Sequence, residues 1–220
     1  ADDRHLLALD SHPNIEVRLC NPIAARSTRL LGFVADFSRT NRRMHNKSFT
    51  ADNQAMIVGG RNIGDEYFEA RPDIEFADLD LLAIGPVVSE VSRQFDAYWN
   101  SPLAFPIAAL SQDRPSDEAI RQARAALREF VLAQKESSYA QALKSSGLAE
   151  GLVEGSLAFN FAKVRVVADD PMKILKESTD DATRLLPKLL PEFESLDSEL
   201  LLVSPYFVPG DAGVDRWRDL

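Results

Sequence analysis

The chain has 220 residues, a formal net charge of −9 and a single cysteine. This length is enough for a substantial hydrophobic core, and the acidic total argues against a general nucleic-acid-binding surface. Because Cys20 is alone, an internal disulfide and a cysteine-based metal cluster are excluded. No apolar stretch approaches the roughly 18 residues that suggest a membrane-spanning helix.

The hydrophobic periodicity predicts alternating strands and helices, which favours an α/β fold. The first predicted strands are short apolar runs bounded by turn residues. They cover residues 14–19, 43–50, 55–60 and 75–84, with a turn at 51–54 between the second and the third. The second and third strands are therefore expected to form a hairpin.

The middle of the chain is predicted to be helical. Gly85-Pro86 begins a helix with one apolar stripe, and the proline-containing residues 100–115 indicate a connector. The longest helix is expected to begin at Ser116, and three glycines within 145–156 indicate a boundary. The later predicted elements are a strand over 162–168, a helix around 185–193 and a strand over 199–203.

Polar residues and glycines around the predicted hairpin follow a fixed spacing. The pattern is H-x-K-x4-D-x6-G-G-x-N, formed by His45, Lys47, Asp52, Gly59, Gly60 and Asn62. In the expected register Lys47 faces Val58 and His45 faces Gly60, and side-chain alternation places both on one face. The glycines leave a space there in which a bulky group can approach the backbone.

These groups suit phosphodiester chemistry. The imidazole of His45 can attack phosphorus and form a phosphohistidine, which divides the displacement into two steps. Lys47 can stabilise the charge on the non-bridging oxygens, and the Asn62 amide can orient them. A second acid must protonate the departing alcohol, and the hairpin supplies no obvious residue for that role.

From His45 to Asn62 the chain resembles the HKD motif of the phospholipase D superfamily. Similarity to bacterial cardiolipin synthases of the C type extends over most of the chain. It is carried by residues 11–19, 42–54, 59–68, 77–80 and 204–210. The superfamily often has serine at the position of Gly60, so the hydroxyl is absent here.

The resemblance implies a phospholipase D-like mixed sheet flanked by helices, in a fold whose two HKD halves pack face to face around one site. Because the chain has one such motif, it is expected to be the first half of a pseudo-dimeric enzyme with the start of the second half. The expected divisions are a first domain over 1–145, incomplete at its N-terminus, a linker over 146–160 and a truncated second domain over 161–220.

The resemblance also implies roles for the motif residues. His45 is expected to be the nucleophile or the general acid–base, and Lys47, Asn62 and Gly60 are expected to bind the phosphate. Asp52 completes the catalytic motif, with an orienting or structural role rather than proton transfer. No metal and no other cofactor is implied.

Neighbouring charged residues are candidates for supporting roles. Glu66 and Asp80 are candidates to fix the tautomer of His45, while Asp65 is more simply a solvated carboxylate or a helix cap. Arg61 lies between Gly60 and Asn62 in sequence and should point to the other face, where a structural ion pair is favoured.

The activity implied by the resemblance is that of a transphosphatidylase, which forms cardiolipin through a covalent phosphohistidine. A phospholipase D-type hydrolase is an alternative, because water can replace the acceptor alcohol. A single-HKD homodimeric phosphodiesterase or nuclease is another, although the acidic total and the strands predicted after residue 155 count against it. The chain alone is also compatible with an inactive half-enzyme or a lipid-surface binding module.

Positive charge gathers around the motif. Between residues 15 and 62 there are eight arginines and lysines against three carboxylates, in a chain of net charge −9. This local positive charge favours binding of an anionic headgroup or an anionic membrane face. The alternative is a basic surface that is simply solvated. The expected partners are an anionic phospholipid such as phosphatidylglycerol, a second HKD half and a membrane surface, but not nucleic acid. The resemblance implies peripheral association with the cytoplasmic side of a bacterial inner membrane.

Overall fold

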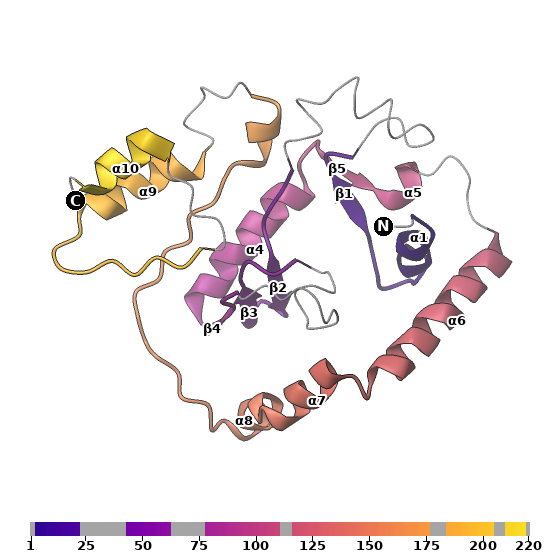
Figure 1. Cartoon of the computed structure of the whole chain (residues 1–220). Coiled ribbons are helices and arrows are strands. Elements are labelled where there is room, and N and C mark those ends of the chain that lie inside the picture. Colours follow the sequence, from indigo (N-terminus) through magenta and orange to yellow (C-terminus); the bar gives the residue numbers. More distant parts are fainter. Residues whose placement is uncertain are drawn as a thin grey trace. The chain divides into compact units, whose positions relative to one another are not determined.

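The computed structural model describes residues 3–22, 43–62, 78–110, 116–176, 184–204 and 210–218. Helices and short antiparallel sheets alternate along these residues, so the predicted mixed α/β class is confirmed (Figure 1). The chain divides into two compact units. Unit one contains residues 1–43, 68–75 and 102–163, and unit two contains residues 44–67, 76–101 and 164–220. Among the helices formed by the described residues, none combines the length and apolar character needed to cross a bilayer.

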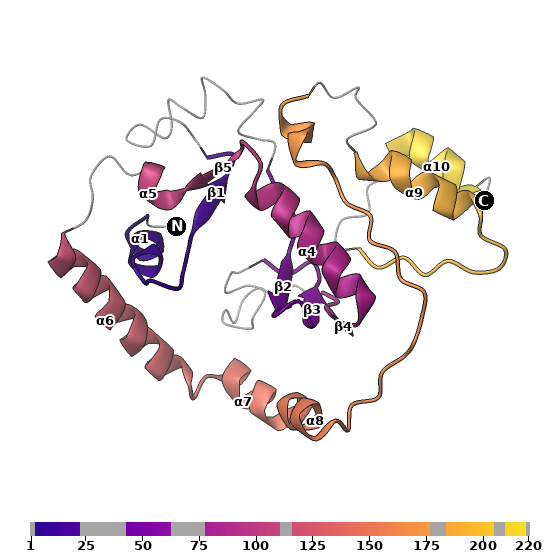
Figure 2. The ribbon, with the colours of Figure 1, turned by 180° about the vertical axis from the view of Figure 1, so that it is seen from behind.

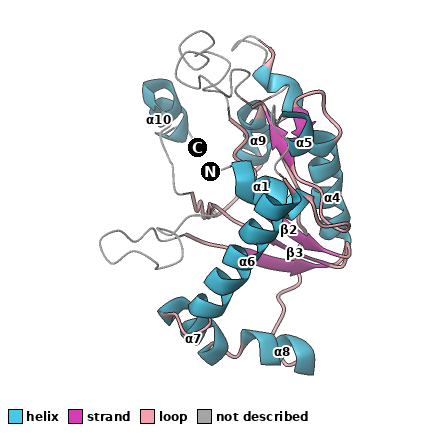
Figure 3. Ribbon diagram, turned by 90° about the vertical axis from the view of Figure 1, so that its right-hand side faces the viewer, coloured by secondary structure: helices cyan, strands magenta, loops and turns pink. Residues whose placement is uncertain are grey.

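Unit one consists of helices and a two-stranded ribbon. Its elements are α1 (Asp3–Asp10), β1 (Arg18–Cys20), β5 (Ala104–Pro106), α5 (Ile107–Leu110), α6 (Asp117–Gln134), α7 (Ser138–Ser145) and α8 (Leu148–Glu154). Helix α1 packs beside α6 (Figure 3), and the Arg124 guanidinium on α6 donates a hydrogen bond to Ser11 Oγ at 2.8 Å. The predicted start of α6 is confirmed, because Ser116 Oγ accepts a hydrogen bond from Ala119 N at 3.2 Å.

The predicted connector over 100–115 is wrong, because it contains β5 and α5. Its prolines do not prevent a strand: Pro106 ends β5 opposite Arg18, in a ribbon that the described residues form from two strands, where a missing N–H is tolerated. Ile107 follows and is fully buried. On the partner strand, burial raises the pKa of the Cys20 thiol, which keeps it protonated at neutral pH.

Unit two contains the predicted hairpin. Its elements are β2 (Ser48–Ala51), β3 (Ala55–Val58), β4 (Leu81–Ile84), α4 (Pro86–Trp99), a 3₁₀ helix (Pro171–Ile174), α9 (Leu185–Glu194) and α10 (Gly210–Arg218). The strands form an antiparallel sheet in the order β2-β3-β4. The predicted start of α4 is confirmed, since Gly85 is its N-cap and Pro86 its first residue.

Two predicted strands are absent from unit two. Residues 162–168 and 199–203 have no regular secondary structure, so those predictions are wrong. Their apolar pattern suits a strand, but a strand also needs a neighbour to complete its backbone hydrogen bonds. Leu201 and Val203 are exposed in the structure.

The core of unit two lies between the sheet and α4. Helix α4 crosses one face of the sheet (Figures 1 and 2). Met56 of β3 is buried there against Val87, Val88 and Val91 of α4, and Val166 packs against the same cluster. The hairpin is therefore supported by a helix and by a segment more than one hundred residues later in the chain.

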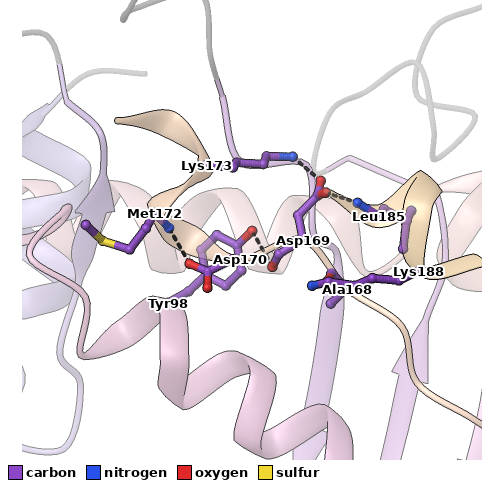
Figure 4. A network of polar contacts seen from close by, with 8 residues as sticks. All are labelled: Tyr98, Ala168, Asp169, Asp170, Met172, Lys173, Leu185 and Lys188. Carbon is purple, nitrogen blue, oxygen red and sulfur yellow. Dashed lines mark hydrogen bonds and ion pairs between the residues drawn. The ribbon is translucent and has the colours of Figure 1, made fainter. Parts of the chain in front are cut away.

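A polar network joins the end of α4 to the later segment (Figure 4). The hydroxyl of Tyr98, a side chain only 5% exposed, donates to Asp169 O at 3.3 Å. The Asp169 carboxylate forms an ion pair with Lys173 and accepts a hydrogen bond from Leu185 N at the start of α9. Lys188 of α9 donates to Ala168 O at 2.8 Å. One aspartate thus connects α4, the 3₁₀ helix and α9.

Removing the Tyr98 hydroxyl should weaken this connection. The variant Tyr98→Phe keeps the buried ring but loses the donor to Asp169 O, so we expect the free energy of unfolding to fall by about 1 kcal/mol. Urea denaturation followed by circular dichroism measures this change. An unchanged midpoint would show that this hydrogen bond adds no stability.

Candidate functional site

The predicted hairpin is confirmed, but its register differs from the expectation by one residue. Ser48 pairs with Val58, so Lys47 lies beside Gly59, whose N–H points to Lys47 O at 3.5 Å. The expected pairing of Lys47 with Val58 is therefore wrong. His45 lies before the first residue pair of the ladder, so its expected pairing with Gly60 is not formed either.

The turn causes this shift. Asp52 and Asn53 both have positive φ, at 51° and 54°, and Gln54 N donates to Ala51 O at 2.9 Å. Aspartate and asparagine tolerate this left-handed conformation better than most residues. Three residues therefore complete the turn where four were expected, and every pair of the ladder moves by one.

The structure places Asp52 away from the other motif residues. It is exposed in the turn, and the four residues of β2 separate it from Lys47. At about 3.3 Å per residue this separation is at least ~13 Å. The position of Asp52 suits a role in the turn, and its expected contribution to catalysis remains a prediction.

His45 and Lys47 occupy the segment that leads into β2. His45 is exposed, Lys47 is partly exposed, and Lys47 Nζ donates to His45 O at 2.8 Å. The Lys47 ammonium group is therefore hydrogen-bonded to the backbone of the residue that carries the imidazole. An anion approaching His45 from solvent would meet a positive charge that belongs to the same short segment.

Two aspartates explain the glycine pair. A Cβ atom on Gly59 would lie within 3.0 Å of the Asp80 carboxylate, and one on Gly60 would lie equally close to the carboxylate of Asp78. Both positions are thus confined to glycine while the aspartates stay in place. The expectation that the glycines leave an open space is therefore wrong for this structure, because these carboxylates occupy it. Asp78 was not among the predicted site residues, although its spacing of two residues from Asp80 repeats the alternation of a strand.

Arg61 forms the ion pair that the sequence predicted. Its Nε atom lies 2.8 Å from Asp80 Oδ2, and both side chains are 33% exposed. Its Nη2 atom also donates to Asp78 O at 3.4 Å. Asp80, a candidate to orient His45, therefore has Arg61 as an ionic partner.

Other predicted site residues fall outside the described residues or at their edge. Asn62 is exposed and is the last described residue after β3. Glu66 and Asp65 lie outside the described residues, as do most of the arginines that precede the motif. Their predicted roles are unchanged by the structure.

A groove of about 470 Å³ lies beside the hairpin turn. It is lined by Ser48, Phe49, Thr50, Asp52, Asn53, Ser92, Phe95 and Asp96. Ser92 Oγ lies 2.6 Å from Asn53 Oδ1 and ties the turn to α4. The groove follows β2, the edge strand of the sheet, and is distinct from the segment that carries His45.

The chain is similar to curated bacterial proteins. It is 42% identical over 214 residues to cardiolipin synthase C of Escherichia coli strain K12, covering 96% of this chain and 44% of that protein. It is 31% identical over 212 residues to an uncharacterized protein of Helicobacter pylori strain J99, covering 96% of the chain and 41% of the relative. The chain therefore spans less than half the length of these relatives. No family model and no solved structure matches it.

Proposed function

We propose that this chain, a cardiolipin synthase-type relative in the phospholipase D superfamily, takes part in the transfer of a phosphatidyl group between phospholipids. The observation that carries the proposal is the 42% identity to cardiolipin synthase C over 96% of the chain. The aligned length is too large to leave out the hairpin and its motif. The exposed His45 and the neighbouring Lys47 supply a nucleophile and a cation in one short segment.

In the proposed reaction the His45 imidazole attacks phosphorus of a phospholipid phosphodiester. A P–N bond forms, the P–O bond to the departing alcohol breaks, and a second acid protonates that alcohol. The hydroxyl of an acceptor lipid then gives its proton to the conjugate base of that second acid and attacks the same phosphorus. The new P–O bond forms, the P–N bond breaks and His45 is regenerated.

The remaining motif residues bind the phosphate in this proposal. Lys47 stabilises the charge on the non-bridging oxygens, and the Asn62 amide orients them. Gly60 contributes its backbone to phosphate binding in this proposal, while the space beside Gly59 and Gly60 is taken by the carboxylates of Asp80 and Asp78. The second acid comes from a second motif half, which we propose as a partner of this chain.

We further propose phosphatidylglycerol as the anionic substrate and the cytoplasmic face of the inner membrane as the place of action. The basic residues around the motif support an anionic ligand. Peripheral binding brings the exposed His45 segment to the lipid surface. If water replaces the acceptor lipid, the same steps give hydrolysis.

The proposal is tested by identifying the lipid products. The chain, alone and combined with a second motif half, is incubated with vesicles of phosphatidylglycerol, and the products are analysed by mass spectrometry. Cardiolipin with released glycerol supports the transferase, whereas phosphatidic acid supports the hydrolase. Activity of the chain alone that rises with dimerisation favours a homodimeric enzyme. Intact substrate in every combination contradicts the proposed function.

A further inference from the structure

We propose that Asp78 and Asp80 are positioning residues that fix the backbone between Gly59 and Asn62. Each carboxylate occupies the space that a side chain on the opposing glycine would fill. We name the two aspartates, the two glycines and Arg61 the carboxylate clamp. The inference rests on the proposed function, because the clamp would act on the reaction through Asn62.

The strand register places the clamp at the end of the sheet. Val58 pairs with Leu81, so the next residues, Gly59 and Asp80, continue that ladder side by side. Lys47 lies on the other side of Gly59. Lys47, Gly59 and Asp80 therefore form one row across three neighbouring segments. Side-chain alternation turns this row away from the face that carries Met56 and α4.

Arg61 neutralises the negative charge in the row of Lys47, Gly59 and Asp80, so that the lysine charge remains. A carboxylate on the same row as Lys47 would otherwise attract the ammonium group and reduce its attraction for phosphate. The Arg61 guanidinium lies 2.8 Å from Asp80 Oδ2 and neutralises that carboxylate. Lys47 Nζ donates to His45 O instead. The clamp thus supports the glycine backbone and leaves the lysine charge beside the nucleophile.

Asp78 holds the second glycine. Its Oδ1 atom accepts a hydrogen bond from Leu79 N at 2.8 Å, which fixes the side chain against its own backbone. Its Oδ2 atom is buried without a hydrogen-bond partner in the part of the chain that the structure describes. Because this carboxylate lies against Gly60, a Cβ atom at that position would have to displace it.

The clamp makes Gly60 and Asp78 a coupled pair. A Cβ atom on Gly60 is not compatible with the present position of the Asp78 carboxylate. The variant Gly60→Ala should therefore lower the urea midpoint of the chain, and the double variant with Asp78→Ala should recover most of the loss. Asp96→Ala, an exposed aspartate on α4, is the matched control and should rescue nothing. An equal loss in both Gly60 variants would overturn the clamp.

A kinetic experiment separates positioning from folding. In the assembled enzyme, with phosphatidylglycerol vesicles as substrate, Asp78→Ala should lower kcat about tenfold with little change in KM. Asp78→Asn keeps the shape and should retain most of the activity. In an Asn62→Ala background, Asp78→Ala should cause no further loss, because both act on the same step. Additive losses, or equal loss in both Asp78 variants, would reject the positioning role.

The two experiments fail in different ways. If the unaltered enzyme gives no product, the proposed function is wrong. The urea midpoints of Gly60→Ala and of its double variant with Asp78→Ala still decide whether the clamp exists. If the enzyme is active and the Asn62 background shows additive losses, the proposed function stands and the positioning role falls.

Discussion

Replacement of His45 by alanine is expected to reduce product formation by about 10⁴-fold or more. The reason is chemical: without the imidazole there is no nitrogen to form the P–N bond, and the displacement must proceed in one step. His45 is exposed in the segment before β2, so the substitution should leave the core of unit two unchanged. Mass spectrometry of lipid products measures the loss.

His12→Ala provides the matched control for this variant. His12 is also exposed, and its Nδ1 atom accepts a hydrogen bond from Asn14 N at 3.2 Å in a turn outside the motif. We expect its product yield to stay close to that of the unaltered protein. A phosphohistidine trapped during turnover should disappear only in His45→Ala if this histidine attacks first. Full turnover by His45→Ala would remove the basis of the proposed mechanism.

The hairpin was predictable because its information is local. Short apolar runs on either side of Asp52 and Asn53 define two strands and a turn. The register was not predictable from the same pattern, because three-residue and four-residue turns both suit these residues. Only the left-handed backbone of Asp52 and Asn53 distinguishes them. A difference of one residue moved Lys47 from Val58 to Gly59.

The clamp could not be predicted because it depends on pairing between distant segments. Gly60 and Asp78 are brought together only when β4 pairs with β3, and no local pattern specifies that register. The polar network at Asp169 is similar, since Tyr98 lies on α4, 71 residues before Asp169 in the sequence. The strand predicted over 162–168 failed for the same reason: local preference suggested a strand, but none of the strands in the described part of the chain pairs with it.

Arg61 shows where local reasoning was sufficient in part. Its position between Gly60 and Asn62 predicted an ion pair, and that pair is formed. The expected opposite face is wrong, because Asp80 continues the row of Lys47 and Gly59. The structure supplies the partner, Asp80. The distinction matters for function, because an arginine that is paired with a carboxylate is a weaker ligand for phosphate than a lysine that donates to a carbonyl oxygen, as Lys47 does.

Removal of the Lys47 charge should cause the second largest loss of activity, after replacement of His45. The variant Lys47→Gln keeps a hydrogen-bond donor for the backbone at His45 but loses the positive charge, so we expect kcat to fall about 10²- to 10³-fold. Lys47→Arg keeps the charge in a different shape and should be less affected. Steady-state kinetics on phosphatidylglycerol vesicles measures both variants.

Lys144→Gln is the control for the loss of one positive charge. Lys144 is an exposed side chain on α7, 65% accessible and 3.8 Å from Glu136, so its removal should leave kcat unchanged. If Lys47→Gln and Lys144→Gln behave alike, the Lys47 ammonium does not stabilise the reacting phosphate. If Lys47→Gln raises KM alone, the charge contributes to binding of the lipid but not to the displacement itself. The expected loss in kcat therefore separates a group that acts on the reacting phosphate from one that only attracts an anionic surface.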